Sequence, residues 1–157
     1  MIYVAENNCC YILVEGAYGY FDGRTNCDVN NKLFRFNITK NTLEELYHNE
    51  ISVDPTAFSN ITDYNNHIAN LPENFFNKGR LAFINNKLYC LTLLNNTMQC
   101  TIREFNFNNK TWTVKHTING LGVPNISFSG QGTVFEFKDE IIILSSDPTR
   151  TYSFNAV

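Results

Sequence analysis

The sequence predicts an all-β protein of about three four-stranded antiparallel units. Two observations support this class. Short apolar segments rich in Tyr, Ile, Leu and Phe alternate with polar pairs along most of the 157 residues, a pattern typical of β-hairpins with tight turns. The same arrangement then recurs along the chain, and an internal repeat has to be identified before local structure because it governs the whole architecture.

The first repeated feature is a hairpin, whose two strands we name a and b. Residues 2–15, 81–94 and 133–146 each hold an apolar segment, a two-residue polar turn and a second apolar segment. The expected turns are Asn7-Asn8, Asn85-Asn86 and Lys138-Asp139. Asn and Asp tolerate the left-handed backbone that such turns require, so each stretch predicts a hairpin.

A second hairpin, with strands c and d, follows the first. Residues 32–46 align with residues 101–115, and residues 151–157 carry a fragment of the same pattern. Three Phe-Asn pairs coincide in this alignment, at Phe36-Asn37, Phe105-Asn106 and Phe154-Asn155. Trp112, the only tryptophan, then coincides with Leu43 and is predicted to open strand d.

Two segments compete with this interpretation. Residues 41–47 have the composition of a short helix, but their alignment with a strand of the second unit favours strand d, because context overrides local propensity. Residues 49–79 have no counterpart elsewhere in the chain and are expected to be a long insert. A turn of helix is expected around Asp63 to Leu71, because long loops in compact domains often have structure of their own.

The order a-b-c-d is that of a propeller blade, so we expect a partial β-propeller in a single domain spanning residues 1–157. The first blade is expected at residues 2–48, the insert at 49–79, the second blade at 80–117 and an incomplete third blade at 131–157.

These units resemble kelch repeats. In that pattern, strand b ends in two glycines, strand c carries Tyr or Phe, and a tryptophan follows a polar turn. Here Glu15-Gly16, Leu94-Asn95 and Ser145-Ser146 stand in place of the glycines, and Trp112 is the one tryptophan. The resemblance implies a kelch-like propeller that acts as a non-enzymatic adaptor or scaffold for a protein partner, often beside a BTB or F-box segment.

A carbohydrate-binding, sialidase-like or galactose-oxidase-like propeller is the alternative. Residues 106–112 resemble a degenerate Asp-box of sialidase-like propellers, with Asn108 and Lys110 replacing its Asp and Gly. The arginines that would bind a sugar carboxylate are scattered along the sequence, and the three histidines are not paired as copper ligands would be. No catalytic residue, metal ligand or cofactor is therefore assigned. A third interpretation is a decayed repeat protein without an activity of its own.

The composition excludes some classes of partner and indicates a cellular compartment. A net charge of −3 and a pI near 5.6 give no basic surface for nucleic acid or anionic membrane. No apolar segment approaches the roughly 20 residues needed to span a bilayer, and the N-terminus lacks signal-peptide features. We therefore expect a cytoplasmic protein whose five cysteines are free thiols used mainly as small buried hydrophobes.

Binding is expected on the face that carries the b–c and d–a connections. These connections are long and rich in aromatic residues, and long loops on a rigid scaffold commonly carry function. The predicted partner-binding residues are Tyr18, Tyr20, Phe21, Arg24, Asp63, Tyr64, His67 and Arg150. An open arc of three blades exposes strand edges, so we expect completion by a longer chain, a second copy or a different chain.

Overall fold

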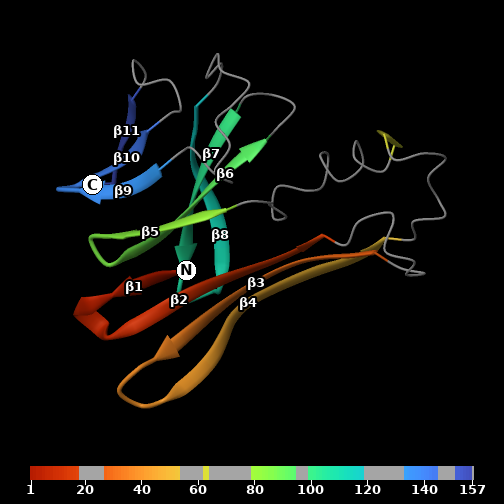
Figure 1. Cartoon of the computed structure of the whole chain (residues 1–157), viewed down its shortest axis with the longest axis horizontal. Coiled ribbons are helices and arrows are strands. Elements are labelled where there is room, and N and C mark those ends of the chain that lie inside the picture. Colours follow the sequence, from red (N-terminus) through yellow and green to blue (C-terminus); the bar gives the residue numbers. More distant parts are fainter. Residues whose placement is uncertain are drawn as a thin grey trace.

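A computed structural model describes residues 1–17, 27–53, 62–63, 79–94, 99–118, 133–144 and 151–156. Within these ranges the chain forms three antiparallel β-sheets (Figure 1). Predictions for the other residues lie outside the described part of the chain. The all-β class is confirmed.

Each sheet is a meander in which a strand pairs with the next one along the chain. Sheet one contains β1 (Ile2–Val4), β2 (Cys9–Ala17), β3 (Cys27–Asn37) and β4 (Thr42–Val53), with the 3-10 helix η1 (Ala5–Asn7) after β1. Sheet two contains β5 (Arg80–Ile84), β6 (Lys87–Leu94), β7 (Gln99–Asn106) and β8 (Thr111–Ile118). Sheet three contains β9 (Thr133–Phe137), β10 (Glu140–Leu144) and β11 (Thr151–Asn155). The predicted order a-b-c-d is confirmed for two sheets, and a-b-c for the third.

The alignment of strands c and d is confirmed by the pairing register. Phe36 lies opposite Leu43 in sheet one, and Phe105 lies opposite Trp112 in sheet two. The residues with helical composition belong to β4, as the alignment predicted. Sheet context therefore overrides the local preference for helix at this position.

The asparagine of each Phe-Asn pair explains why the chain turns where it does. The Asn37 side-chain oxygen accepts a hydrogen bond from the Lys40 backbone N–H at 2.8 Å. The equivalent oxygen of Asn106 accepts hydrogen bonds from the backbone N–H groups of Asn108 and Asn109, at 2.9 and 3.3 Å. These bonds satisfy turn donors that have no partner in the strand ladder.

The two c–d hairpins also share a β-bulge. The register between β3 and β4 shifts between Leu33 and Phe34, and that between β7 and β8 shifts between Ile102 and Arg103. In the alignment these are the same positions, so the repeat extends to an irregularity of the backbone. Such bulges increase the local twist of a strand pair.

The a–b turns follow the prediction in sheets two and three. Asn85 and Asn86 both adopt left-handed backbone, with φ of 50° and 60°, and Lys138 has φ of 56°. In sheet one the predicted two-residue turn is wrong. β1 and β2 are joined by η1 and left-handed Asn8, because the Asn8 N–H bonds the Ala5 carbonyl at 3.2 Å and closes a wider turn.

The long connections are shorter than the sequence suggested. β4 continues to Val53, beyond the expected end of the first blade at residue 48, and β3 begins at Cys27 rather than near Lys32. β3 and β4 pair along this whole extension, from Cys27 opposite Val53 to Asn37 opposite Thr42. The repeat alignment missed the extension because β7 and β8 have no equivalent of it.

Two hydrophobic clusters hold the sheets together. Between sheets one and two the buried residues are Val4, Cys9, Tyr11, Leu33, Leu46, Leu88 and Phe105. Between sheets two and three they are Ala82, Ile84, Tyr89, Leu91, Cys100, Ile102, Ile141, Ile143 and Ala156. Sheet two is therefore covered on both faces, and its alternating residues divide between the two clusters.

The contact between neighbouring sheets repeats. Tyr11 of sheet one packs in the cluster that contains Phe105 of sheet two, and Tyr89 of sheet two packs against Phe154 of sheet three with ring centroids 5.9 Å apart. We name the sheet face that carries Tyr11 or Tyr89 the tyrosine face. The opposite face, which carries Phe36, Phe105 or Phe154, is the phenylalanine face. Each contact joins the tyrosine face of one sheet to the phenylalanine face of the next.

The first strands of the sheets lie together. β5 contacts both β1 and β9, and the three strands lie near one another in Figure 1. The sheets are thus stacked in chain order with their first strands on the same side.

Candidate functional site

The predicted binding residues lie mainly beyond what the structure describes. Asp63 is exposed and has helical backbone together with Thr62. The other predicted residues, Tyr18, Tyr20, Phe21, Arg24, Tyr64, His67 and Arg150, lie outside the described residues. Whether they gather on one face stays a prediction.

The strand ends show how the two kinds of connection are distributed. The a–b and c–d turns are short and belong to the described residues. The b–c connections and the connections between sheets run through residues 18–26, 54–78, 95–98, 119–132 and 145–150, of which only 62–63 are described. In a meander the two kinds of connection leave a sheet at opposite ends. In sheet one the two short turns are joined by a hydrogen bond from the Ile38 N–H to the Asn8 carbonyl, at 3.1 Å.

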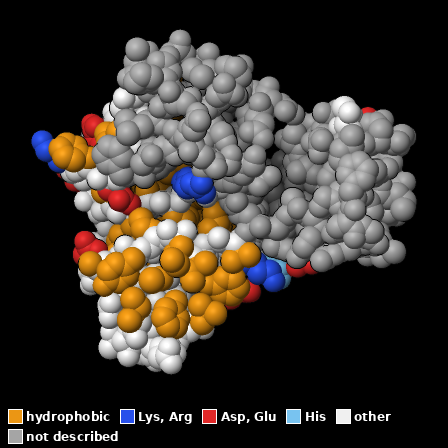
Figure 2. Space-filling view, viewed as in Figure 1, with side chains coloured by type: hydrophobic (Ala, Val, Ile, Leu, Met, Phe, Trp, Pro, Cys, Tyr) orange, Lys and Arg blue, Asp and Glu red, His pale blue; other side chains and the backbone are white. Residues whose placement is uncertain are grey.

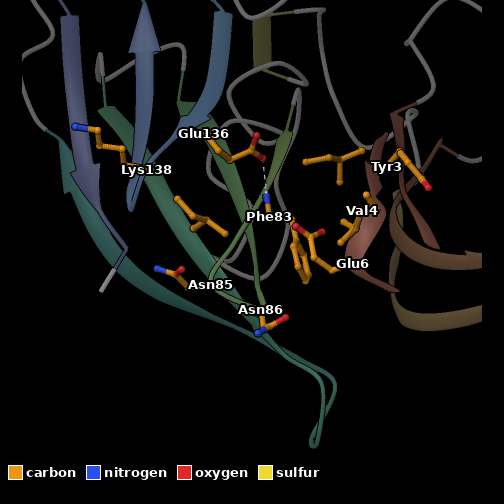
Figure 3. A pocket seen from close by; sticks show the side chains of 11 residues that line it. Tyr3, Val4, Glu6, Phe83, Asn85, Asn86, Glu136 and Lys138 are labelled. Carbon is orange, nitrogen blue, oxygen red and sulfur yellow. Dashed lines mark hydrogen bonds between the residues drawn. The ribbon is translucent and has the colours of Figure 1, made fainter. Parts of the chain in front are cut away.

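An open pocket of about 590 Å³ lies where the first strands converge (Figure 3). Its walls come from all three sheets: β1 and η1, β5 and its turn, and β9 and its turn. The polar and charged residues that line it are Tyr3, Glu6, Asn85, Asn86, Glu136 and Lys138. Because the turns of three sheets form it, the pocket exists only once the sheets are stacked.

Hydrogen bonds at and beside this pocket join sheets two and three. The Glu136 carboxylate of β9 accepts a bond from the Phe83 N–H of β5 at 2.8 Å, and Asn85 donates to the Asp139 carboxylate at 3.1 Å. Phe83 lies on an edge strand, so Glu136 occupies a backbone donor that would otherwise face solvent. The groups exposed in the pocket offer hydrogen bonding and charge of both signs.

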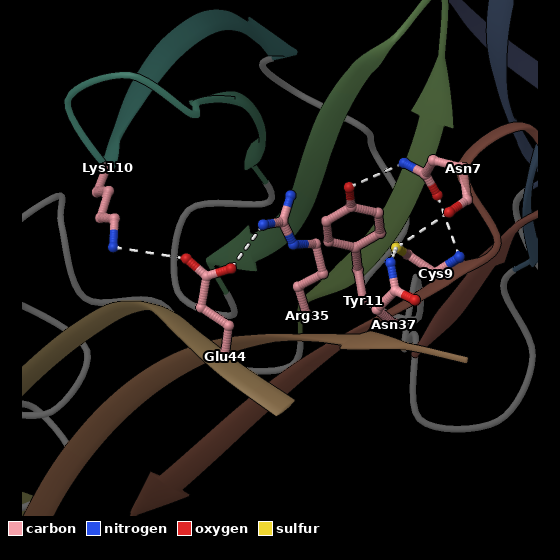
Figure 4. Close-up of polar contacts among 7 residues, drawn as sticks. All are labelled: Asn7, Cys9, Tyr11, Arg35, Asn37, Glu44 and Lys110. Carbon is pink, nitrogen blue, oxygen red and sulfur yellow. Dashed lines mark hydrogen bonds and ion pairs between the residues drawn. The ribbon is translucent and has the colours of Figure 1, made fainter. Parts of the chain in front are cut away.

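A network of hydrogen bonds connects the two turns at one end of sheet one (Figure 4). Asn7 donates to the Tyr11 hydroxyl at 3.1 Å and accepts from the Cys9 N–H at 3.1 Å. Asn37, from the neighbouring turn, reaches the Cys9 sulfur at 3.6 Å. Asn7 therefore helps to position Tyr11, which contacts Phe83 of sheet two in a stacked geometry, and Asn37 connects the neighbouring turn to Cys9.

Glu44 links the turn ends of sheets one and two. It accepts a hydrogen bond from Arg35 at 2.6 Å, which raises the pKa of that guanidinium, and lies 3.9 Å from Lys110. The side chains are about half exposed, so solvent screens the pairs and each contributes at most about 1 kcal/mol. The main effect of these ion pairs is to orient the two turns relative to each other.

Arg103 is the buried charge of sheet two. It is 4% exposed and donates to the buried Thr92 hydroxyl. Burial raises the pKa of the nearby Cys100 thiol to about 12, although the Arg103 charge opposes this shift. A thiol with such a pKa is protonated and unreactive at neutral pH.

The cysteines and histidines behave as the sequence suggested where the structure describes them. Cys9 and Cys100 belong to the two hydrophobic clusters, which confirms their use as small hydrophobes, and Cys90 is also buried. His48 and His116 are exposed. Across the described ranges, no group of three or more His, Cys, Asp and Glu residues could hold a metal ion.

Sequence reasoning missed the pocket of Figure 3. It placed function at the long connections, whereas the described pocket is built from the a–b turns. The available signal was the charged residues beside two of these turns, with Glu6 in the first and Glu136 and Lys138 at the third.

No helix among the described residues has the length and apolar character needed to cross a bilayer. No protein-family model, curated protein or solved structure matches this chain.

Proposed function

We propose that the chain is a segment of a kelch-like β-propeller and that it is a non-enzymatic adaptor or scaffold for a protein partner. The observation that carries the propeller is the repeated contact between tyrosine and phenylalanine faces. Every sheet meets its neighbour through equivalent positions, with the first strands on the same side. Such a repeated relationship is what radial stacking of blades requires.

The partner is proposed to bind at the b–c connections and the connections between sheets. What supports this site is the contrast in length. The turns at one end are short and closed by asparagine hydrogen bonds, whereas the connections at the other end include residues 18–26 and 54–78. Long connections on a rigid stack of sheets offer the adaptable surface that partner binding uses.

The cytoplasm is the proposed compartment. The buried Cys9 and Cys100 are free thiols, and free thiols are typical of proteins that work in a reducing environment.

The test is capture of a partner with matched variants at the two ends of the sheets. The double variant Tyr18→Ala and Arg24→Ala alters the long connections, and Asn108→Ala alters an exposed turn residue at the other end. We expect one specific protein to bind the wild type and Asn108→Ala alike, and to bind the double variant at least about tenfold more weakly, which corresponds to about 1.4 kcal/mol. Equal binding by all three chains would contradict the proposed site.

The carbohydrate alternative is tested on the same material. A glycan array probed with the wild type and the double variant should show no bound sugar if the chain is a protein-interaction module. Binding of a glycan by the wild type that the double variant loses would replace the adaptor with a carbohydrate-binding propeller.

A further inference from the structure

The phenylalanine face of sheet one is apolar and uncovered. A row of side chains crosses all four strands on this face, since Tyr3 pairs with Cys10, Cys10 with Phe36 and Phe36 with Leu43. Tyr3 is 55% exposed and Leu43 is 62% exposed. Figure 2 shows hydrophobic side chains gathered over this sheet.

The same row is covered in the other sheets. In sheet two it consists of Phe83, Leu88, Phe105 and Trp112, and it packs on the tyrosine face of sheet one. In sheet three it consists of Glu136, Ile141 and Phe154. The two apolar side chains pack on sheet two, and Glu136 accepts the hydrogen bond from the Phe83 N–H. Within the described residues, no tyrosine face therefore packs against the phenylalanine face of sheet one.

The missing half is present at the opposite end of the stack. On the tyrosine face of sheet three, Ile142 is the counterpart of buried Tyr89. Ile142 follows the residue that pairs with Phe154, just as Tyr89 follows the residue that pairs with Phe105. Phe137, on the same face, is 57% exposed. Its counterpart in sheet two, Ile84, is buried under sheet three.

We propose that two copies of this chain associate head to tail, the tyrosine face of sheet three in each copy covering the phenylalanine face of sheet one in the other. The proposal rests on the propeller described above but not on the adaptor role. The occupant is a second copy because the two open faces of one chain are complementary halves of the contact that already joins its sheets.

The turns and the pocket fit this arrangement. The turns of sheets two and three are joined by the Asn85–Asp139 bond. In the pairing register Lys138 takes the place of Asn85, so continuing that row into a second copy brings the Lys138 ammonium of one chain beside the η1 turn of the other, which carries the oppositely charged Glu6 carboxylate. Two copies supply six sheets, within the range of about 4 to 8 blades of closed propellers, and would enclose the pocket that is open in one copy.

The test measures solution mass by light scattering over a concentration series. The variants are Leu43→Lys on sheet one, with Tyr3→Lys as a second change on that face, and Phe137→Lys on sheet three. The control is Ile38→Lys, an apolar residue of similar exposure (43%) in the β3–β4 turn. Circular dichroism checks that each variant keeps its strands.

We expect the wild type and Ile38→Lys to reach twice the monomer mass of 18.1 kDa. Each face variant alone should raise the dimer dissociation constant at least about tenfold, because both contacts would contain a buried unpaired charge. An equal mixture of Leu43→Lys and Phe137→Lys should associate more tightly than either alone, since one contact then joins two unaltered faces. Only a head-to-tail dimer predicts this recovery.

Three results would overturn the proposal: a wild type that stays monomeric at every concentration, Phe137→Lys dimerising as tightly as the wild type, or assemblies that grow beyond the dimer. The second result, combined with a weaker Leu43→Lys dimer, would show a contact of sheet one with itself. A negative result for the dimer would not affect the proposal that a partner binds the long connections. A negative result in partner capture would likewise not affect the dimer, so the two proposals are tested independently.

Discussion

Trp112 and Leu43 stand at the same position of successive sheets, each opposite a phenylalanine, yet their surroundings differ. Trp112 packs edge-on against Tyr47 of sheet one, with ring centroids 6.4 Å apart, whereas Leu43 is 62% exposed. The difference follows from position in the stack, because sheet one covers Trp112 and no described residue covers Leu43 in this way.

Truncation on the covered and uncovered faces should therefore have unequal effects. Phe105→Ala removes a buried ring of the cluster between sheets one and two and should lower the free energy of unfolding by about 3–5 kcal/mol. Leu43→Ala, made at an exposed position, should change it by less than about 0.5 kcal/mol. Urea denaturation at concentrations that keep the chain monomeric measures both. Similar losses for the two variants would contradict the assignment of the faces.

The asparagine that closes the β7–β8 turn should contribute through its acceptor oxygen. Asn106→Ala leaves two turn N–H groups without their side-chain acceptor and should cost about 1–2 kcal/mol. Asn106→Asp keeps an acceptor and should retain most of this stability. Thermal unfolding followed by circular dichroism gives the comparison, with Asn108→Ala as the control. Equal midpoints for Asn106→Ala and Asn108→Ala would argue against the capping role.

Lys110 should be replaceable by glycine with a gain in stability. Its φ of 56° is left-handed backbone, which costs a residue with a Cβ about 1–2 kcal/mol. Lys110→Gly should raise the free energy of unfolding by about 1 kcal/mol despite loss of the screened contact with Glu44. Lys110→Ala loses the same contact without relieving the backbone and should not stabilise. Chemical denaturation separates the two, and equal effects would refute the strain argument.

Stability should fall at alkaline pH. Burial raises the pKa of Tyr89 to about 12, with a further contribution from Glu104, and burial raises the pKa of Cys100 to about 12. Ordinary values near 10 for Tyr and 8.5 for Cys hold in the unfolded chain. Between these values and 12 the native state binds more protons than the unfolded state. The contribution of these two groups to the free energy of unfolding is therefore fully present below about pH 8.5 and is lost as pH rises toward 12.

The measurement is the denaturation midpoint from pH 8 to pH 11. Tyr89→Phe cannot ionise and should flatten the decline, although it also loses the hydrogen bond to the Ala156 carbonyl at 3.3 Å. Its midpoint at pH 8 corrects for that loss. An unchanged slope in Tyr89→Phe and in Cys100→Ala would show that other groups control alkaline unfolding.

Much of the fold could be predicted because hairpins are local. The Phe-Asn pairs located the c–d turns, and the register then placed Trp112 over Phe105 and Leu43 over Phe36. The wide turn at Asn8 and the extension of β4 to Val53 could not be predicted, because each depends on bonds that the equivalent hairpins do not make.

The candidate site was less accessible to sequence reasoning. The predicted binding residues other than Asp63 lie outside the described part of the chain. The pocket between the turns joins Glu6, Asn85 and Glu136, which are distant in sequence and meet only when the sheets stack.

By itself, the sequence determined the strands, their order and the equivalence of positions within each unit, since alternation, tight turns and pairing register are properties of neighbouring residues. The tertiary structure decided which of two equivalent faces is buried. The same phenylalanine is buried at Phe105 and only partly buried at Phe36, because burial depends on the sheet that packs against a face and not on the residues that form it.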